Sequence, residues 1–89
     1  MKLDNSEIKK IFESTGFTKH QVNKEDVFEK DGAYYRLTYL NDEMGYVIES
    51  ADSIEEAKLN RYEDDDIIKL GDSKESTINA IKACLESYY

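Results

Sequence analysis

The most constraining feature of the sequence is a run of strand-forming residues with a turn signal in front of it. Residues 33–40 contain three tyrosines together with Leu and Thr, and the dipeptide Asp31-Gly32 precedes them. An Asp-Gly dipeptide between extended segments is typical of a tight β-hairpin. A second strand-forming run follows at residues 46–51. With a short strand around residues 26–30, these runs predict a three-stranded antiparallel meander.

Helical periodicity replaces this alternation at both ends of the chain. Asp4 and Glu7 have the spacing of a capping box, and Gly16 supplies the residue type that commonly ends a helix. Asp72 and Glu75 repeat the capping-box spacing near the C-terminus. The apolar residues after them recur at intervals of three and four, which predicts an amphipathic helix with a stripe of Ile78, Ile81, Leu85 and Tyr88.

The remaining segments give weaker signals. Ser53, with Glu56 three residues later, predicts a short middle helix. Residues 18–23 fit a weak strand or a loop, and residues 67–70 fit a short edge strand or a buried loop. We therefore expect a single α+β domain over residues 1–89, with an antiparallel sheet of three to four strands. An N-terminal helix, the short middle helix and a C-terminal helix would pack against this sheet.

Composition excludes several classes of protein. Eighty-nine residues suffice for one domain, and a single cysteine cannot form an internal disulfide. The first five residues do not lead into an apolar run, and no segment has the length of a membrane span. We accordingly expect a cytoplasmic protein without a membrane association.

The net charge of −8 is confined to one segment. Residues 1–40 carry seven acidic and seven basic side chains, and residues 67–89 carry three of each. Residues 41–66 carry ten acidic side chains and only Lys58 and Arg61 as bases. Such a region repels nucleic acid and anionic membranes and attracts a cationic partner. An acidic surface that only maintains solubility remains the alternative interpretation.

The residue types that support catalysis or metal binding are sparse. His20 is the only histidine, and Cys84 lies one step off the apolar stripe of the last helix. The acidic residues 63–66 are consecutive, whereas calcium loops alternate their ligands and contain a turn glycine. We therefore expect no catalytic residues, no metal and no cofactor, although a small enzyme with perturbed carboxylates remains a third class to test.

Residues 46–60 (YVIESADSIEEAKLN), followed by Tyr62-Glu63-Asp64, resemble the small bacterial immunity proteins that accompany polymorphic secreted or contact-dependent toxins. The resemblance covers approximately residues 33–66. Proteins of that class are compact, acidic and cytosolic. The resemblance implies one-to-one binding of the C-terminal domain of a cognate toxin, which blocks its active site or an adjacent surface.

The function expected from the sequence is thus neutralisation of a bacterial toxin domain of basic charge, with a nuclease domain as one candidate. Tyrosines would supply contact area to this protein partner, and carboxylates would pair with its Lys and Arg side chains. The alternative is an acidic nucleic-acid mimic or adaptor that binds a DNA-binding protein. The predicted partner-binding residues are Tyr46, Glu49, Asp52, Glu55, Glu56, Tyr62, Glu63, Asp64, Asp65 and Asp66.

Overall fold

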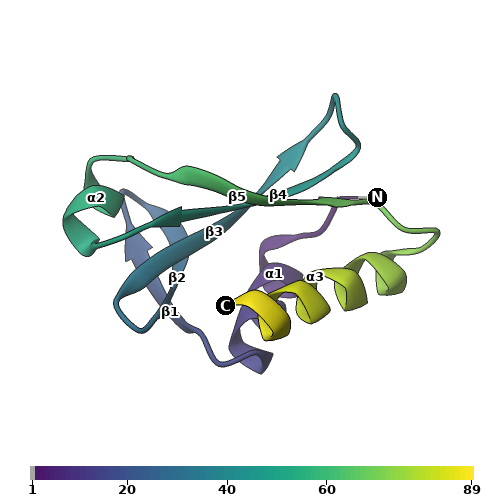
Figure 1. Cartoon of the computed structure of the whole chain (residues 1–89), viewed down its shortest axis with the longest axis horizontal. Helices are drawn as coiled ribbons and strands as arrows, with labels where there is room; N and C mark the ends of the chain where they lie inside the picture. The colour runs from purple at the N-terminus through teal and green to yellow at the C-terminus, as the bar shows by residue number, and fades with distance from the viewer. Residues whose placement is uncertain (1) are drawn as a thin grey trace.

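The computed structural model describes residues 2–89 and confirms the α+β class (Figure 1). Three helices accompany one antiparallel sheet. In chain order the elements are α1 (Asn5–Ser14), β1 (Thr18–Val22), β2 (Glu25–Lys30), β3 (Ala33–Leu40), β4 (Gly45–Ala51), α2 (Ile54–Lys58), β5 (Glu63–Lys69) and α3 (Lys74–Tyr88).

The sheet has five strands in the order β1-β2-β3-β4-β5, so the prediction of three to four strands was too low. Both additional strands are edge strands, which are paired on one side only. Their side chains are mostly exposed, and they therefore lack the apolar alternation that identifies a half-buried strand in sequence. The acidic residues 63–66, which we did not assign to a strand, form the first half of β5.

Two tight turns set the register of the first three strands. Asp31 and Gly32 have φ values of 53° and 87°, which confirms the predicted hairpin between β2 and β3. Asn23 and Lys24 make the corresponding turn between β1 and β2, with φ values of 55° and 66°. Because a lysine stands where such turns usually have glycine, this second hairpin carries little signal in the sequence.

The first helix has the predicted ends. The backbone N–H of Glu7 donates to Asp4 Oδ1 at 2.8 Å, and the N–H of Asp4 donates to Glu7 Oε1 at 3.0 Å, which completes the capping box. Gly16 has φ = 93° after the last turn. The chain then reverses, so that the ring of Phe17 packs edge-on against Phe12 at 5.2 Å between centroids.

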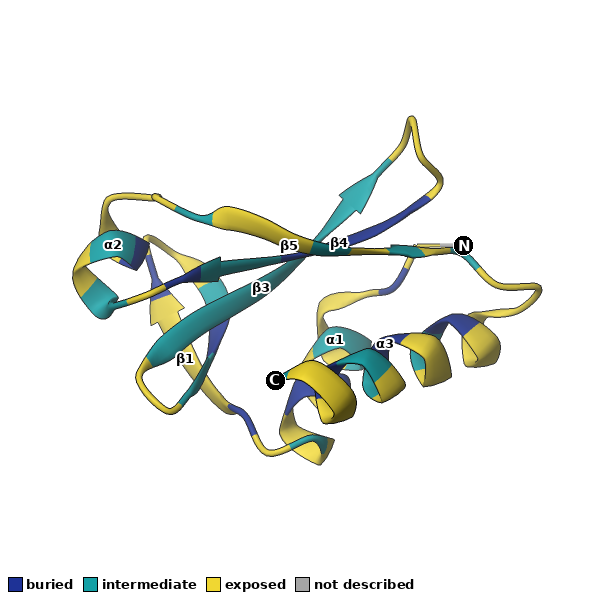
Figure 2. Ribbon diagram, viewed as in Figure 1, coloured by how far each residue is buried: buried dark blue, intermediate teal, exposed yellow. Residues whose placement is uncertain are grey.

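Helices α1 and α3 cover one face of the sheet and enclose the main core (Figures 1 and 2). Phe12 from α1 stacks on Phe28 from β2 with a centroid distance of 4.3 Å. Ile81 and Leu85 from α3 are fully buried on the same side. The buried residues of this core are Leu3, Ile11, Phe12, Phe17, Phe28, Tyr46, Ile48, Ile81 and Leu85.

Helix α2 covers one end of the opposite face of the sheet. Its Ala57 is buried against Ala51 at the end of β4 and against Val22 and Val27 from the first hairpin. Ser53 caps this helix by accepting a hydrogen bond from the N–H of Glu56, as predicted. Because α2 has only five residues, it packs against one end of this face only.

The N-cap of α3 is one residue later than predicted. Ser73 and Ser76 form the capping box, whereas Asp72 and Glu75 do not. At its other end, Tyr89 ties the helix to the sheet, since its hydroxyl donates to Asp66 Oδ2 at 2.5 Å and its backbone oxygen accepts from Lys30 Nζ at 2.7 Å. Within residues 2–89, no helix combines the length and the apolar character needed to cross a membrane.

Candidate functional site

The ten predicted partner-binding residues divide into an interior group and a surface group. Tyr46, Glu49 and Asp66 are engaged within the fold, and Tyr62 is half-buried. The other six lie around α2 and the first half of β5, at the end of the molecule shown on the left of Figure 1. We call this group of six the acidic end: Asp52, Glu55, Glu56, Glu63, Asp64 and Asp65.

Tyr46 is a core residue and not a surface anchor. Its side chain is only 1% exposed, and its hydroxyl accepts a hydrogen bond from the N–H of Leu3 at 2.6 Å. Burial raises the pKa of this hydroxyl, although the Leu3 hydrogen bond partly opposes the effect. Tyr46 lies opposite Tyr39 on the face covered by α1 and α3, a position that strand alternation alone could not distinguish from the open face.

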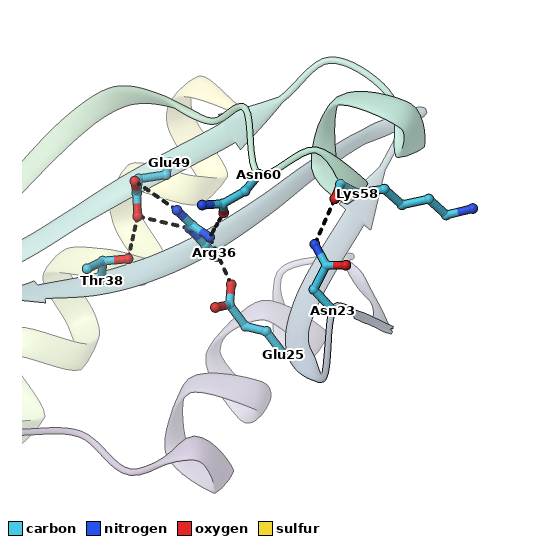
Figure 3. Close-up of polar contacts among 7 residues, drawn as sticks. All are labelled: Asn23, Glu25, Arg36, Thr38, Glu49, Lys58 and Asn60. Atoms are coloured by element: carbon cyan, nitrogen blue, oxygen red, sulfur yellow. Dashed lines mark hydrogen bonds and ion pairs between the residues drawn. The ribbon is translucent and has the colours of Figure 1, made fainter.

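Glu49 is bound by Arg36, which lies at the centre of a polar network on the face of the sheet opposite α1 and α3 (Figure 3). Arg36 Nε and Nη2 donate to the two carboxylate oxygens of Glu49 at 3.1 and 3.4 Å, and Thr38 donates to the same carboxylate. Arg36 Nη1 also donates to Glu25 at 3.1 Å and to Asn60 at 2.9 Å. Glu49 therefore satisfies an internal cation.

The charge of Arg36 is stabilised by these contacts. Burial alone would lower the pKa of the guanidinium, but the hydrogen bonds and ion pairs with Glu49 and Glu25 outweigh it, so the pKa is raised. The guanidinium carbon lies 3.9 Å from the centroid of the Tyr62 ring, in a cation–π contact. One face of Tyr62 is thus already occupied, and only its remaining surface is available to a partner.

Asp66 differs from its three acidic neighbours in sequence. It lies opposite Ile48 and accepts the hydroxyl of Tyr89. The pairing between β4 and β5 shifts at this point, because Asp66 pairs with Ile48 and Asp64 pairs with Glu49, which leaves Asp65 as the extra residue of a β-bulge. The bulge allows one carboxylate to point inward while Glu63, Asp64 and Asp65 remain exposed.

Three residues of the acidic end, Asp52, Glu56 and Glu63, line a shallow cleft of about 630 Å³. The cleft lies between the end of β4, the start of α2 and the start of β5. Among the described residues, the one basic side chain that lines it is Arg61, whose Nη1 is 4.0 Å from Glu56 Oε2. Both of these side chains are well exposed, so their mutual attraction is weak. The lining residues are Ser50, Asp52, Ser53, Glu56, Arg61, Tyr62 and Glu63.

The carboxylates of the acidic end extend a row of charges across three strands. Arg36, Glu49 and Asp64 occupy neighbouring positions on β3, β4 and β5. Like charges that lie directly opposite on a sheet are destabilising, and Arg36 compensates by neutralising Glu49. Because β5 is the last strand of the described sheet, no basic residue within residues 2–89 takes the corresponding position beyond Asp64. The outermost carboxylate in this row therefore faces solvent without a compensating cation on its outer side.

A second cleft, of about 540 Å³, was not predicted from the sequence. It opens where β2 separates from β3, which pair only over residues 28–30 and 33–35. Its walls carry both signs of charge, among them Lys24, Asp26 and Arg36. No sequence signal marks this cleft, because it depends on where two strands diverge. Its mixed charges do not select one class of ligand.

The other candidate residues identified in the sequence have structural positions. Cys84 is half-buried, and burial with the nearby Asp66 carboxylate raises the pKa of its thiol, which opposes nucleophilic reactivity. His20 is exposed on β1, with its Nε2 3.7 Å from Glu29. In the part of the chain from residue 2 onward, no three His, Cys, Asp or Glu side chains are arranged to hold a metal ion.

Comparison with known proteins gave no match: no family model, no curated protein and no solved structure corresponds to the chain.

Proposed function

We propose that this protein is an immunity protein that binds and neutralises the C-terminal domain of a cognate bacterial toxin. The observation that carries the proposal is the acidic end, where three of six neighbouring carboxylates (Asp52, Glu56 and Glu63) line one cleft and Arg61 is the only basic lining residue described. The sequence resemblance of residues 33–66 to immunity proteins supports the same function. The partner that fits this surface is a basic protein domain, and a domain that cleaves nucleic acid would carry such a basic surface.

The physical role of the acidic end is to accelerate encounter and to fix orientation. Exposed carboxylates attract a basic surface over roughly 8–10 Å at ordinary ionic strength. On contact they pair with Lys and Arg side chains, and the accessible part of the Tyr62 ring adds apolar area. Because the attraction acts before contact, charge changes at this surface affect the association rate more than the dissociation rate.

The test is a pair of charge-reversal variants that alter net charge equally at two places. The double substitution Asp64→Lys/Asp65→Lys changes the acidic end. Asp66 is left intact because it accepts the Tyr89 hydroxyl. The matched control, Asp42→Lys/Glu43→Lys, changes two exposed acidic residues in the loop between β3 and β4, remote from α2 (Figure 1).

The binding partner in this experiment is the toxin domain that the proposal expects to be encoded beside the gene for this protein. We expect the Asp64/Asp65 variant to associate about tenfold more slowly than wild type at 50 mM salt, with a smaller difference at 500 mM salt. The control should stay within about twofold of wild type. We expect coexpression of the wild-type protein, but not of this variant at the same level, to restore growth to cells that produce the toxin domain.

Two outcomes would reject the proposal. Equal slowing by both variants would show that net charge matters and the acidic end does not. A toxin domain that remains fully active in the presence of an excess of this protein would exclude neutralisation.

A further inference from the structure

We propose that the outer edge of β5 is a docking edge, to which a basic extended segment of the partner adds as a sixth strand. The inference rests on the proposed function for the identity of that partner. It names the way in which the acidic end and the partner would make contact, and it is carried by the backbone geometry of β5.

The orientation of the β5 backbone follows from one hydrogen bond. Leu70 N–H donates to the carbonyl of Met44 at 3.0 Å, so the backbone polar groups of Leu70 point toward β4. In an antiparallel ladder, successive residues direct these groups to alternate sides. Ile68 therefore also faces β4, whereas the N–H and C=O groups of Ile67 and Lys69 point away from it.

Among residues 2–89, no strand pairs with this outer side of β5. Figure 1 shows β5 along the border of the sheet, and α3 lies against one face of it and not along its edge. Ile67 is 49% exposed. The edge thus combines unpaired backbone groups with an accessible apolar side chain, which are the two components that strand addition requires.

The charges beside the outer edge of β5 indicate which kind of extended segment can bind there. Glu63, Asp64 and Asp65 are exposed along the first half of β5. In a parallel, in-register pairing with a second copy of β5, these carboxylates would face their own copies, which is unfavourable. The same carboxylates favour a strand that carries Lys or Arg. Charge complementarity therefore points to an extended segment in which basic residues alternate with apolar residues able to contact Ile67.

The test uses amide hydrogen exchange with three synthetic peptides. The probe is Lys-Val-Lys-Val-Lys-Val-Lys, which is basic and forms strands. Glu-Val-Glu-Val-Glu-Val-Glu reverses the charge. Lys-Pro-Lys-Pro-Lys-Pro-Lys keeps the charge, but its prolines remove every second backbone N–H and fix φ at about −65°, which disfavours a continuous ladder. In the protein alone, we expect the amides of Ile67 and Lys69 to exchange faster than the inward-facing amides of Ile68 and Leu70.

With the Lys-Val peptide at ten times its dissociation constant, exchange at Ile67 and Lys69 should slow about tenfold. The other two peptides should leave it unchanged. Equal slowing by the Lys-Pro peptide would show attraction without strand pairing and would overturn the inference, as would no slowing by the Lys-Val peptide. Slowing that depends on protein concentration without any peptide would identify a second copy as the occupant and would also overturn it.

A backbone variant gives a second measurement. Ile67→Pro removes the outward N–H without removing a hydrogen bond to β4, and Ile67→Ala removes the side chain but keeps the N–H. We expect Ile67→Pro to bind the Lys-Val peptide at least fivefold more weakly than Ile67→Ala, and equal binding would contradict strand addition. If Ile67→Pro does not fold, the hydrogen-exchange measurements with the three peptides decide whether strand addition occurs. Because these assays contain no toxin, they succeed or fail independently of toxin neutralisation.

Discussion

Arg36 joins four segments of the chain through one side chain. It contacts Glu25 on β2, Glu49 on β4, and Asn60 and Tyr62 in the segment after α2. The sequence shows Arg36 only as a lone base in an apolar strand. Its role depends on Glu49 lying directly opposite and on the chain after α2 returning to the same place, and both are properties of the folded sheet.

We expect Arg36→Met to destabilise the protein by about 2 kcal/mol, because the half-buried Glu49 carboxylate loses its charged hydrogen bonds. Urea unfolding at pH 7 measures the loss. Adding Glu49→Gln to this variant should recover part of the stability, since it removes the uncompensated charge. If the double variant were less stable than Arg36→Met, the carboxylate would not be the source of the loss.

At the scale of secondary structure, the helices were more predictable than the strands at the edges. The N-terminal cap of α1 involves residues three apart, so its hydrogen bonds depend on local sequence alone. The acidic half of β5, in contrast, has no local preference for a strand. The acidic half of β5 forms a strand because β4 supplies the hydrogen-bonding partner and because the side chains of this half remain in solvent.

The pairing of β4 with β5 depends on a close approach at Gly45. A Cβ atom at this position would lie 2.5 Å from the carbonyl oxygen of Ile68. We therefore expect Gly45→Ala to lower the free energy of unfolding by roughly 2 kcal/mol, because backbone must move to relieve the contact. Met44→Ala is the control, since Met44 is 62% exposed and should change stability by less than about 0.5 kcal/mol. Equal stability of the two variants would show that the strands separate easily at this point.

At the scale of the whole molecule, buried tyrosines make the fold sensitive to alkaline pH. Burial raises the pKa values of Tyr35, Tyr46, Tyr62 and Tyr89, and for Tyr89 the carboxylate of Asp66 adds to the effect. Well below pH 10, each of these hydroxyls is neutral in both the folded and the unfolded chain. Above pH 10 the unfolded chain releases these protons more readily, so their contribution to stability is lost as the pH rises further.

We therefore expect the free energy of unfolding to fall steadily between pH 10 and pH 12, as measured by urea titration at each pH. Tyr89→Phe should be less stable at pH 8, because it loses the hydrogen bond to Asp66, but its decline at high pH should be shallower. Tyr88→Phe, which removes an exposed hydroxyl from the adjacent residue, should retain the wild-type profile. A decline of equal slope in all three proteins would assign the alkaline loss to other groups.

The sequence by itself determined the α+β class, the ends of α1, the N-cap of α2 and the central hairpins, because capping, turn formation and strand preference act between near neighbours. It also located the excess negative charge in residues 41–66. Only the tertiary structure decided which of those residues reach the surface. Tyr46 is buried by α1 and α3, Glu49 is bound by Arg36, and a bulge turns Asp66 toward Tyr89. These outcomes depend on contacts between residues distant in the chain, which local patterns do not encode.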